Sequence, residues 1–143
     1  MKTLAAALFL LAGGIGIAAW LHLSRQPYYP VARVAAPEGI VYTAFSGRAA
    51  GEEACRAANE RFVEPIRAQC KSCAVEFMRC EREAEAAQQR LAAAQGAHVL
   101  YVRDTVIVIA GPDLAAAESC RIIAADLEKH AVPNARCVAP AKG

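Results

Sequence analysis

Residues 63–94 read VEPIRAQCKSCAVEFMRCEREAEAAQQRLAAA, and this stretch decides the predicted fold. Its apolar and cysteine residues recur at alternating spacings of three and four, the pattern of one face of a coiled-coil helix. Pro65 suits the first turn of such a helix, and Gly96 suits the residue after its end. The spacing therefore predicts one long helix over about 65–95. Its inward face would carry Val63, Ile66, Cys70, Cys73, Phe77, Cys80, Ala84, Ala87, Leu91 and Ala94.

Cysteines are the unusual members of that face, because Leu, Ile and Val normally fill a helical seam. The chain has six cysteines, an even number that is typical of exported proteins with a disulfide framework. We expect three disulfides, each joining Cys70, Cys73 or Cys80 on the long helix to another predicted element. The other three cysteines are Cys55, Cys120 and Cys137.

The pairing itself stays open, since six cysteines allow 15 arrangements. A bridge between Cys73 and Cys80 is excluded within one regular helix, where seven residues span ~10 Å. A second possibility is that the face at 63–94 pairs with its copy in another chain. That arrangement would give a cross-linked homodimer.

The N-terminus carries an apolar or glycine run from Leu4 to Leu21. Its length, about 18 residues, is at the short end for spanning ~30 Å of hydrocarbon. Trp20 suits the membrane interface, and we predict that residues 1–25 form a membrane anchor. Gly16-Ile17-Ala18 also suits a signal peptidase, so the alternative is cleavage before Ala19 and secretion.

The cysteines favour an oxidising compartment for the rest of the chain. We therefore expect a single-pass protein of the inner (plasma) membrane with its C-terminal domain on the periplasmic or extracellular side. Residues 26–39 are predicted as a linker with a possible edge strand at 31–35, and residues 40–139 as the exported domain. That domain is expected to contain strands at 40–45, 98–102, 105–109 and 135–138, and helices at 49–62, 65–95 and 113–129.

This order of elements is similar to the split βαβ, ferredoxin-like arrangement with an enlarged first helical connection. The predicted fold class is therefore α+β. Two phrases, residues 41–46 ahead of one helix and residues 109–112 ahead of another, resemble the SPOR domains that bind cell-wall glycan. The resemblance implies cell-wall glycan as a candidate partner. The cysteine-bearing helix departs from that family, and no binding residue is carried over.

Charge and polar residues exclude several function classes. The total charge of +2 comes from the N-terminal segment, where Lys2 and Arg25 lie, and the rest of the chain is balanced. It has no basic stripe interleaved with aromatic residues, so no nucleic acid partner is expected. Ser119 is predicted on the solvent side of its helix, and the two histidines beyond the apolar segment, His98 and His130, suit a strand start and a helix end. We expect no catalytic residues and no cofactor.

Cys70-Lys71-Ser72-Cys73 has the one catalytic spacing in the sequence. A redox pair needs a stabilised thiolate, which is best achieved at a helix N-terminus. Thiol-disulfide exchange or redox sensing, with Cys70 attacking and Cys73 resolving, is therefore the alternative function. A zinc site that combines these cysteines and Cys80 with His98, His130 or Cys120 lacks the second paired knuckle, so no metal is expected.

The sequence thus predicts a membrane-tethered, exported binding or assembly module without catalytic activity, stabilised by disulfides. Its partner is expected to be a protein or cell-wall glycan.

Overall fold

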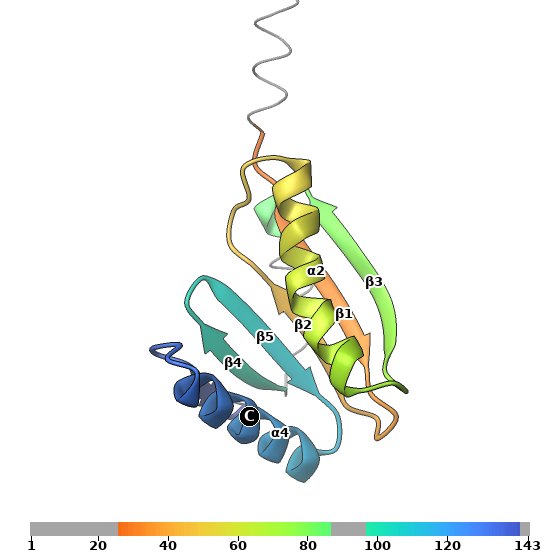
Figure 1. Ribbon diagram of the computed structural model, residues 1–143, viewed down its shortest axis with the longest axis vertical. Coiled ribbons are helices and arrows are strands. Elements are labelled where there is room, and N and C mark those ends of the chain that lie inside the picture. Colours follow the sequence, from red (N-terminus) through yellow and green to blue (C-terminus); the bar gives the residue numbers. More distant parts are fainter. Residues whose placement is uncertain (1–25, 87–96, 141–143) are drawn as a thin grey trace, which may run out of the picture.

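The computed structural model describes residues 26–86 and 97–140. A six-stranded antiparallel sheet and two helices make up most of this part of the chain (Figure 1). In chain order the elements are β1 (Tyr29–Ala35), β2 (Val41–Phe45), α2 (Glu52–Gln69), β3 (Ala74–Glu81), β4 (His98–Val102), β5 (Thr105–Ala110), α4 (Asp113–Lys129) and β6 (Arg136–Val138). The α+β class is confirmed.

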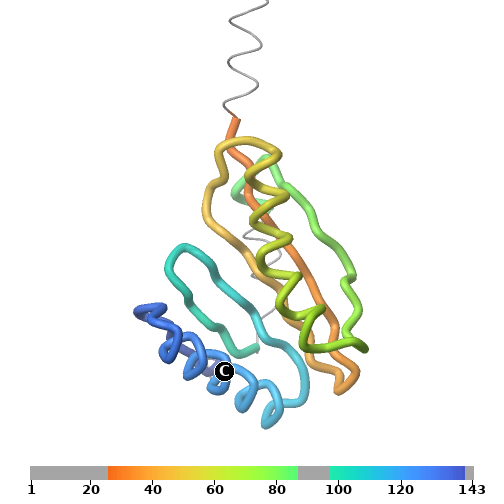
Figure 2. Tube along the Cα trace, in the orientation of Figure 1, coloured from red at the N-terminus to blue at the C-terminus, as the bar shows by residue number. Residues whose placement is uncertain are grey.

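The sheet has the order β3-β1-β2-β5-β4-β6, which reads as two similar halves from its two edges. Each half, 29–81 and 98–138, is a hairpin followed by a helix and a third strand that returns beside the hairpin's first strand. The halves meet where β2 pairs with β5, with Thr43 opposite Val108. Figure 2 shows the first half in orange to green and the second in cyan to blue. The topology is therefore an internal two-fold repeat of a ββαβ unit.

Both helices cover the same face of the sheet. Val34 pairs with Tyr42, which pairs with Ile109, and side chains of directly paired residues point to one side. Val63 of α2 packs with Val34 in one buried cluster, and Cys120 of α4 packs with Ile109 in another. The opposite face buries a third cluster around Val31, Phe45, Ala97 and Val108. The helices thus have separate cores on one face.

The long helix predicted at 65–95 is wrong. The helix that begins at Glu52 continues through Pro65 and ends at Gln69, and residues 74–81 form β3. In β3 every second side chain faces the same side, and its backbone pairs with β1 along the length of that strand. This pairing outweighs the helical propensity of an Ala-, Glu- and Arg-rich segment. Residues 87–95 of the prediction lie outside the described residues.

The ferredoxin-like topology is also wrong. In a split βαβ sheet the last strand would lie beside the strand at 40–45, whereas β6 pairs with β4 at the outer edge. The possible edge strand at 31–35 is instead an inner strand, because β1 pairs with both β2 and β3. The unpredicted strand β3 therefore completes a repeat that the sequence pattern did not indicate.

All six cysteines form disulfides, as expected from their number, but the expected pairing is correct for one bridge only. Cys55–Cys80 joins α2 to β3, and Cys120–Cys137 joins α4 to β6. Cys70 pairs with Cys73 because α2 ends before them and the chain turns, which brings their Cα atoms to 5.4 Å. No free cysteine remains in the described chain, and the single helix on which the homodimer hypothesis depends is not formed.

Candidate binding groove

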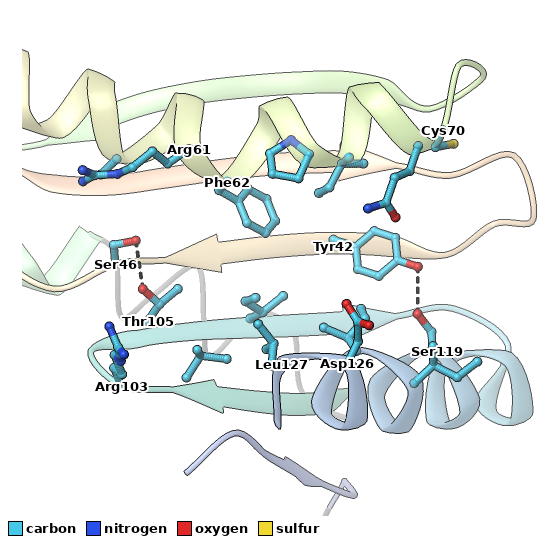
Figure 3. Close-up of a pocket in the computed structure, with 18 of the residues that line it drawn as sticks. Tyr42, Ser46, Arg61, Phe62, Cys70, Arg103, Thr105, Ser119, Asp126 and Leu127 are labelled. Atoms are coloured by element: carbon cyan, nitrogen blue, oxygen red, sulfur yellow. Dashed lines mark hydrogen bonds between the residues drawn. The ribbon is translucent and has the colours of Figure 1, made fainter. Parts of the chain in front are cut away.

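A groove of about 1480 Å³ runs between α2 and α4 (Figure 3). It exists because α2 packs on β1 and β3 while α4 packs on β4, β5 and β6. The central strand β2 lies between the two helices and forms the floor together with β5. Both halves of the repeat therefore contribute to one open site.

The middle of the groove is mainly apolar, and the exposed carboxylate of Asp126 is the charged group on its α4 wall in Figure 3. Phe62 comes from α2 and Leu127 from α4, and Figure 3 places them on opposite walls. Ile107 lies on the floor, and Ile122 on the α4 wall is 60% exposed. The exposed Ile122 and the half-buried Phe62 both offer apolar area that a ligand would bury. The groove lining also includes Ile66 and Ile123.

One end of the groove is basic. Arg61 from α2 and Arg103 from the β4–β5 turn lie at this end, beside the hydrogen bond between the Ser46 and Thr105 hydroxyls at 3.3 Å. Arg48, from the loop between β2 and α2, also lines the groove. No ion pair involves these three arginines within the described residues. Their charge is thus available to a ligand.

Arg103 occupies an unusual backbone position. It is the first residue of the two-residue turn between β4 and β5 and has φ of 53°. Glycine is preferred at such a turn position, and another residue there costs roughly 1 kcal/mol. Its neighbour Asp104 lies against Gly47, where an added Cβ would be 3.1 Å from a carboxylate oxygen of Asp104. The turn is thereby held against the loop that carries Arg48.

The other end of the groove is lined by two exposed acidic residues, Glu38 and Glu118, and contains the short-loop disulfide. The Tyr42 hydroxyl and the Ser119 hydroxyl are 2.8 Å apart, and Figure 3 places Cys70 at the same end. Cys73 also lines the groove. Ser119 was expected on the solvent side of its helix, and that expectation is wrong because α4 turns this residue toward β2.

The disulfide between Cys70 and Cys73 lies at the C-terminal end of α2, whereas a thiolate is stabilised at a helix N-terminus. Cys70 is the C-cap residue that follows α2, and its backbone N–H donates to the Ile66 carbonyl at 2.7 Å. The negative end of the helix dipole is at this terminus and disfavours an anionic sulfur. The exposed side chain of Lys71 provides one nearby positive charge.

The two histidines considered in the sequence analysis, His98 and His130, lie at the start of β4 and the end of α4. A ring nitrogen of His98, a residue 7% exposed, lies 3.1 Å from a carboxylate oxygen of Asp113 at the start of α4. His130 lies at the end of α4, where its Nδ1 is 2.9 Å from the Asp126 carbonyl. In the described parts of the chain no group of three or more histidine, cysteine or acidic residues is arranged to hold a metal ion.

Sequence reasoning missed the groove residues. The sequence places Tyr42 in a predicted strand and Phe62 in a predicted helix, and no local pattern indicates that both line one groove. Arg103 carried a weak signal, since a two-residue hairpin turn without glycine or asparagine is uncommon.

No protein-family model, curated protein or solved structure matches this chain. Neither described helix is both long enough and apolar enough to cross a membrane. The predicted anchor at 1–25 lies outside the described residues.

Proposed function

We propose that this chain is an exported, membrane-tethered binding module without catalytic activity, and that its partner binds in the groove between α2 and α4. Three disulfides support an oxidising, exported environment. The apolar run at 4–21 supports a membrane tether.

The observation that carries the proposal is the groove itself. Clefts that combine an apolar middle with a few polar groups at defined places are the usual form of a binding site. Here the apolar middle includes Phe62 and Ile122, while Arg61 and Arg103 lie at one end. This surface is exposed because α2 and α4 pack on different strands of the sheet. If the two helices contacted each other across β2, they would bury it.

Site-specific photo-crosslinking in intact cells tests the proposal. A photoreactive phenylalanine analogue at Ile122, which lines the groove, is expected to give a discrete adduct. The matched control is the same analogue at Leu114, which is on α4 and 86% exposed but does not line the groove. Equal adducts from both positions, or none from Ile122, would contradict a groove-bound partner.

Membrane attachment has its own test. After carbonate extraction, an anchored chain stays in the membrane pellet and its intact mass includes residues 1–18. A soluble chain that begins at Ala19 would show that residues 1–18 are a cleaved signal segment and not an anchor.

Thiol-disulfide exchange is the second candidate, and a specific observation favours it. The Cys70–Cys73 bridge has no counterpart in the second half of the repeat. It lines the groove next to two exposed residues, Lys71 and Ser72. In an exchange step a partner thiolate would attack one sulfur while the other leaves as a thiolate. The partner's second thiol would then complete the reaction and pass two electrons to the cysteine pair.

Alkylation of free thiols followed by mass spectrometry separates the two candidates. Protein isolated from its native membrane is expected to have six blocked cysteines and to run as a monomer on a non-reducing gel. Two alkylated thiols at Cys70 and Cys73 would favour exchange, and a band of twice the mass would indicate a cross-linked dimer.

A further inference from the structure

The charged residues that line the groove differ between its two ends. Its basic end carries Arg48, Arg61 and Arg103, with Asp104 as the acidic side chain among them. At the other end β2 begins just after Glu38, and Glu118 precedes Ser119 on α4; both acidic residues are exposed and line the groove. A ligand that complements the site therefore has a negative group at one end and tolerates a positive group at the other.

The basic end is built by three separate elements. Arg61 is on α2, Arg48 is in the loop before α2, and Arg103 is in the β4–β5 turn of the other half. Arg103 keeps a backbone conformation that glycine would adopt more easily. Backbone strain of this kind is concentrated at functional sites, and here it presents a guanidinium to the groove. Guanidinium groups bind carboxylates through paired hydrogen bonds.

The middle of the groove selects apolar side chains over sugars. Its lining is mainly aliphatic and includes Ile66, Ile107 and Ile122 in addition to Phe62. The second aromatic ring, that of Tyr42, has its hydroxyl engaged with Ser119 at 2.8 Å. An aliphatic surface gains most from burying Leu, Ile or Phe side chains, whereas a glycan would bring hydroxyl groups onto it.

The size of the groove suits a short extended chain. From Arg61 to Gln69 the wall formed by α2 rises about 12 Å, at 1.5 Å per residue. An extended chain covers that length with about four residues. Both floor strands already pair on their two sides, β2 with β1 and β5 and β5 with β2 and β4, so the occupant is held by side chains and not by strand addition.

We propose that the groove binds an extended polypeptide segment that places an acidic residue against Arg61 and Arg103 and apolar side chains against Phe62 and Ile122. This inference rests on the proposed function and specifies its ligand. The partner is a protein with an exposed, unstructured segment in which acidic and apolar residues lie within about four positions.

Fluorescence anisotropy with full-length chain in detergent micelles tests the inference, with empty micelles as the blank. The probes are fluorescein-labelled hexapeptides with the core Asp-Leu-Phe-Lys, the neutral core Asn-Leu-Phe-Gln and the basic core Lys-Leu-Phe-Lys. The acidic probe is expected to bind at least tenfold more tightly than the basic probe.

Protein variants assign that preference to residues. Arg61→Glu combined with Arg103→Glu is expected to weaken the acidic probe about tenfold and to strengthen the basic probe. Arg121→Glu is the matched control, since this exposed arginine on α4 does not line the groove. Arg103→Gly removes the charge with a residue that the turn prefers, so lost binding in that variant is not due to misfolding. Phe62→Ser is expected to weaken all three probes.

The outcomes are distinguishable from failure of the proposed function. Probes that bind with equal affinity and are weakened by Phe62→Ser would overturn the acidic ligand and leave the groove as a binding site. Purified cell-wall glycan strands that bind through Phe62 while no peptide does would replace the polypeptide with a sugar. If no probe binds and Ile122 gives no photo-adduct in cells, both proposals fail.

Discussion

The two halves of the sheet share one topology but hold their third strand differently. In the first half β3 has eight residues and pairs with β1 at seven positions. In the second half β6 has three residues and pairs with β4 at three. Each third strand is also bonded through a disulfide to the helix of its own half. Hydrogen bonding can therefore hold β3 without its disulfide, whereas the disulfide is the main tether of β6.

The helices show the same difference at corresponding positions. Asn59 and Cys120 are each the eighth residue of their helix, and both are buried. Cys120 forms the disulfide to β6, while the Asn59 side-chain amide donates to the Arg79 carbonyl of β3 at 2.9 Å. The first half has its disulfide one turn earlier, at Cys55. Both halves also stack an arginine on an aromatic ring, Arg79 on Phe77 and Arg136 on Tyr101.

Removal of the two inter-element disulfides, one at a time, is expected to have the largest effect on stability and to separate the two halves. The Cys120→Ala/Cys137→Ala variant and the Cys55→Ala/Cys80→Ala variant are each expected to lose about 3 kcal/mol in free energy of unfolding, because each bridge closes a loop of similar size. Amide hydrogen exchange should separate them, with protection lost in β6 of the first variant and kept in β3 of the second. Equal loss in both third strands would show that the halves depend on their disulfides alike.

Removal of the third disulfide tests whether it stands outside the repeat. Cys70→Ala/Cys73→Ala opens a loop with a sequence separation of three, so the expected loss is at most about 2 kcal/mol. Thermal and denaturant unfolding measure this loss, and hydrogen exchange should remain protected in both β3 and β6. Exchange of the whole of β3 would instead assign the bridge a structural role in the first half.

Asn59→Ala isolates the hydrogen bond that the first half has in place of a cysteine. The variant is expected to lose about 1 kcal/mol in free energy of unfolding, because the buried amide and the Arg79 carbonyl lose their contact. The neighbouring exposed residue is the control, and Glu60→Ala should change stability by less than about 0.5 kcal/mol. A larger effect from Glu60→Ala would assign the loss to the helix and not to the bond.

Tyr42→Phe gives the smallest expected effect and tests the contact between the halves. Its hydroxyl bonds to Ser119 across the β2–α4 boundary, and its removal should cost about 0.5 kcal/mol. Ser119→Ala should cost a similar amount, and the double variant no more than either single one. Additive losses would mean that the two hydroxyls act independently.

Local signals in the sequence predicted the second half well. The hairpin at 98–102 and 105–110 has β-branched runs around a two-residue turn, and α4 begins after Gly111-Pro112, so both were predicted within one residue of their bounds. The first half failed at β3, where a spacing of three and four among cysteines and alanines suggested a helix. The alternation of Val75 and Phe77 was the signal for a strand, but it is only two residues long.

The groove and the disulfide pairing were beyond local reasoning. Tyr42 and Ser119 are 77 residues apart in the chain and meet only because β2 pairs with β5. The number of disulfides followed from the cysteine count, whereas their pairing depended on where α2 ends. Because α2 ends at Gln69 and the predicted helix to Gln95 is not formed, two of the three bridges differ from the expected pairing.

None of the three disulfides crosses the line where β2 meets β5. If the chain is pulled at its two ends, the segments from Cys55 to Cys80 and from Cys120 to Cys137 cannot be drawn out, because a disulfide closes each of them. No disulfide holds the junction of β2 and β5, which depends on the five residue pairs between its strands, on two side-chain hydrogen bonds and on apolar packing between the halves. The sheet can therefore part at this junction without breaking any disulfide, and that separation would open the floor of the groove.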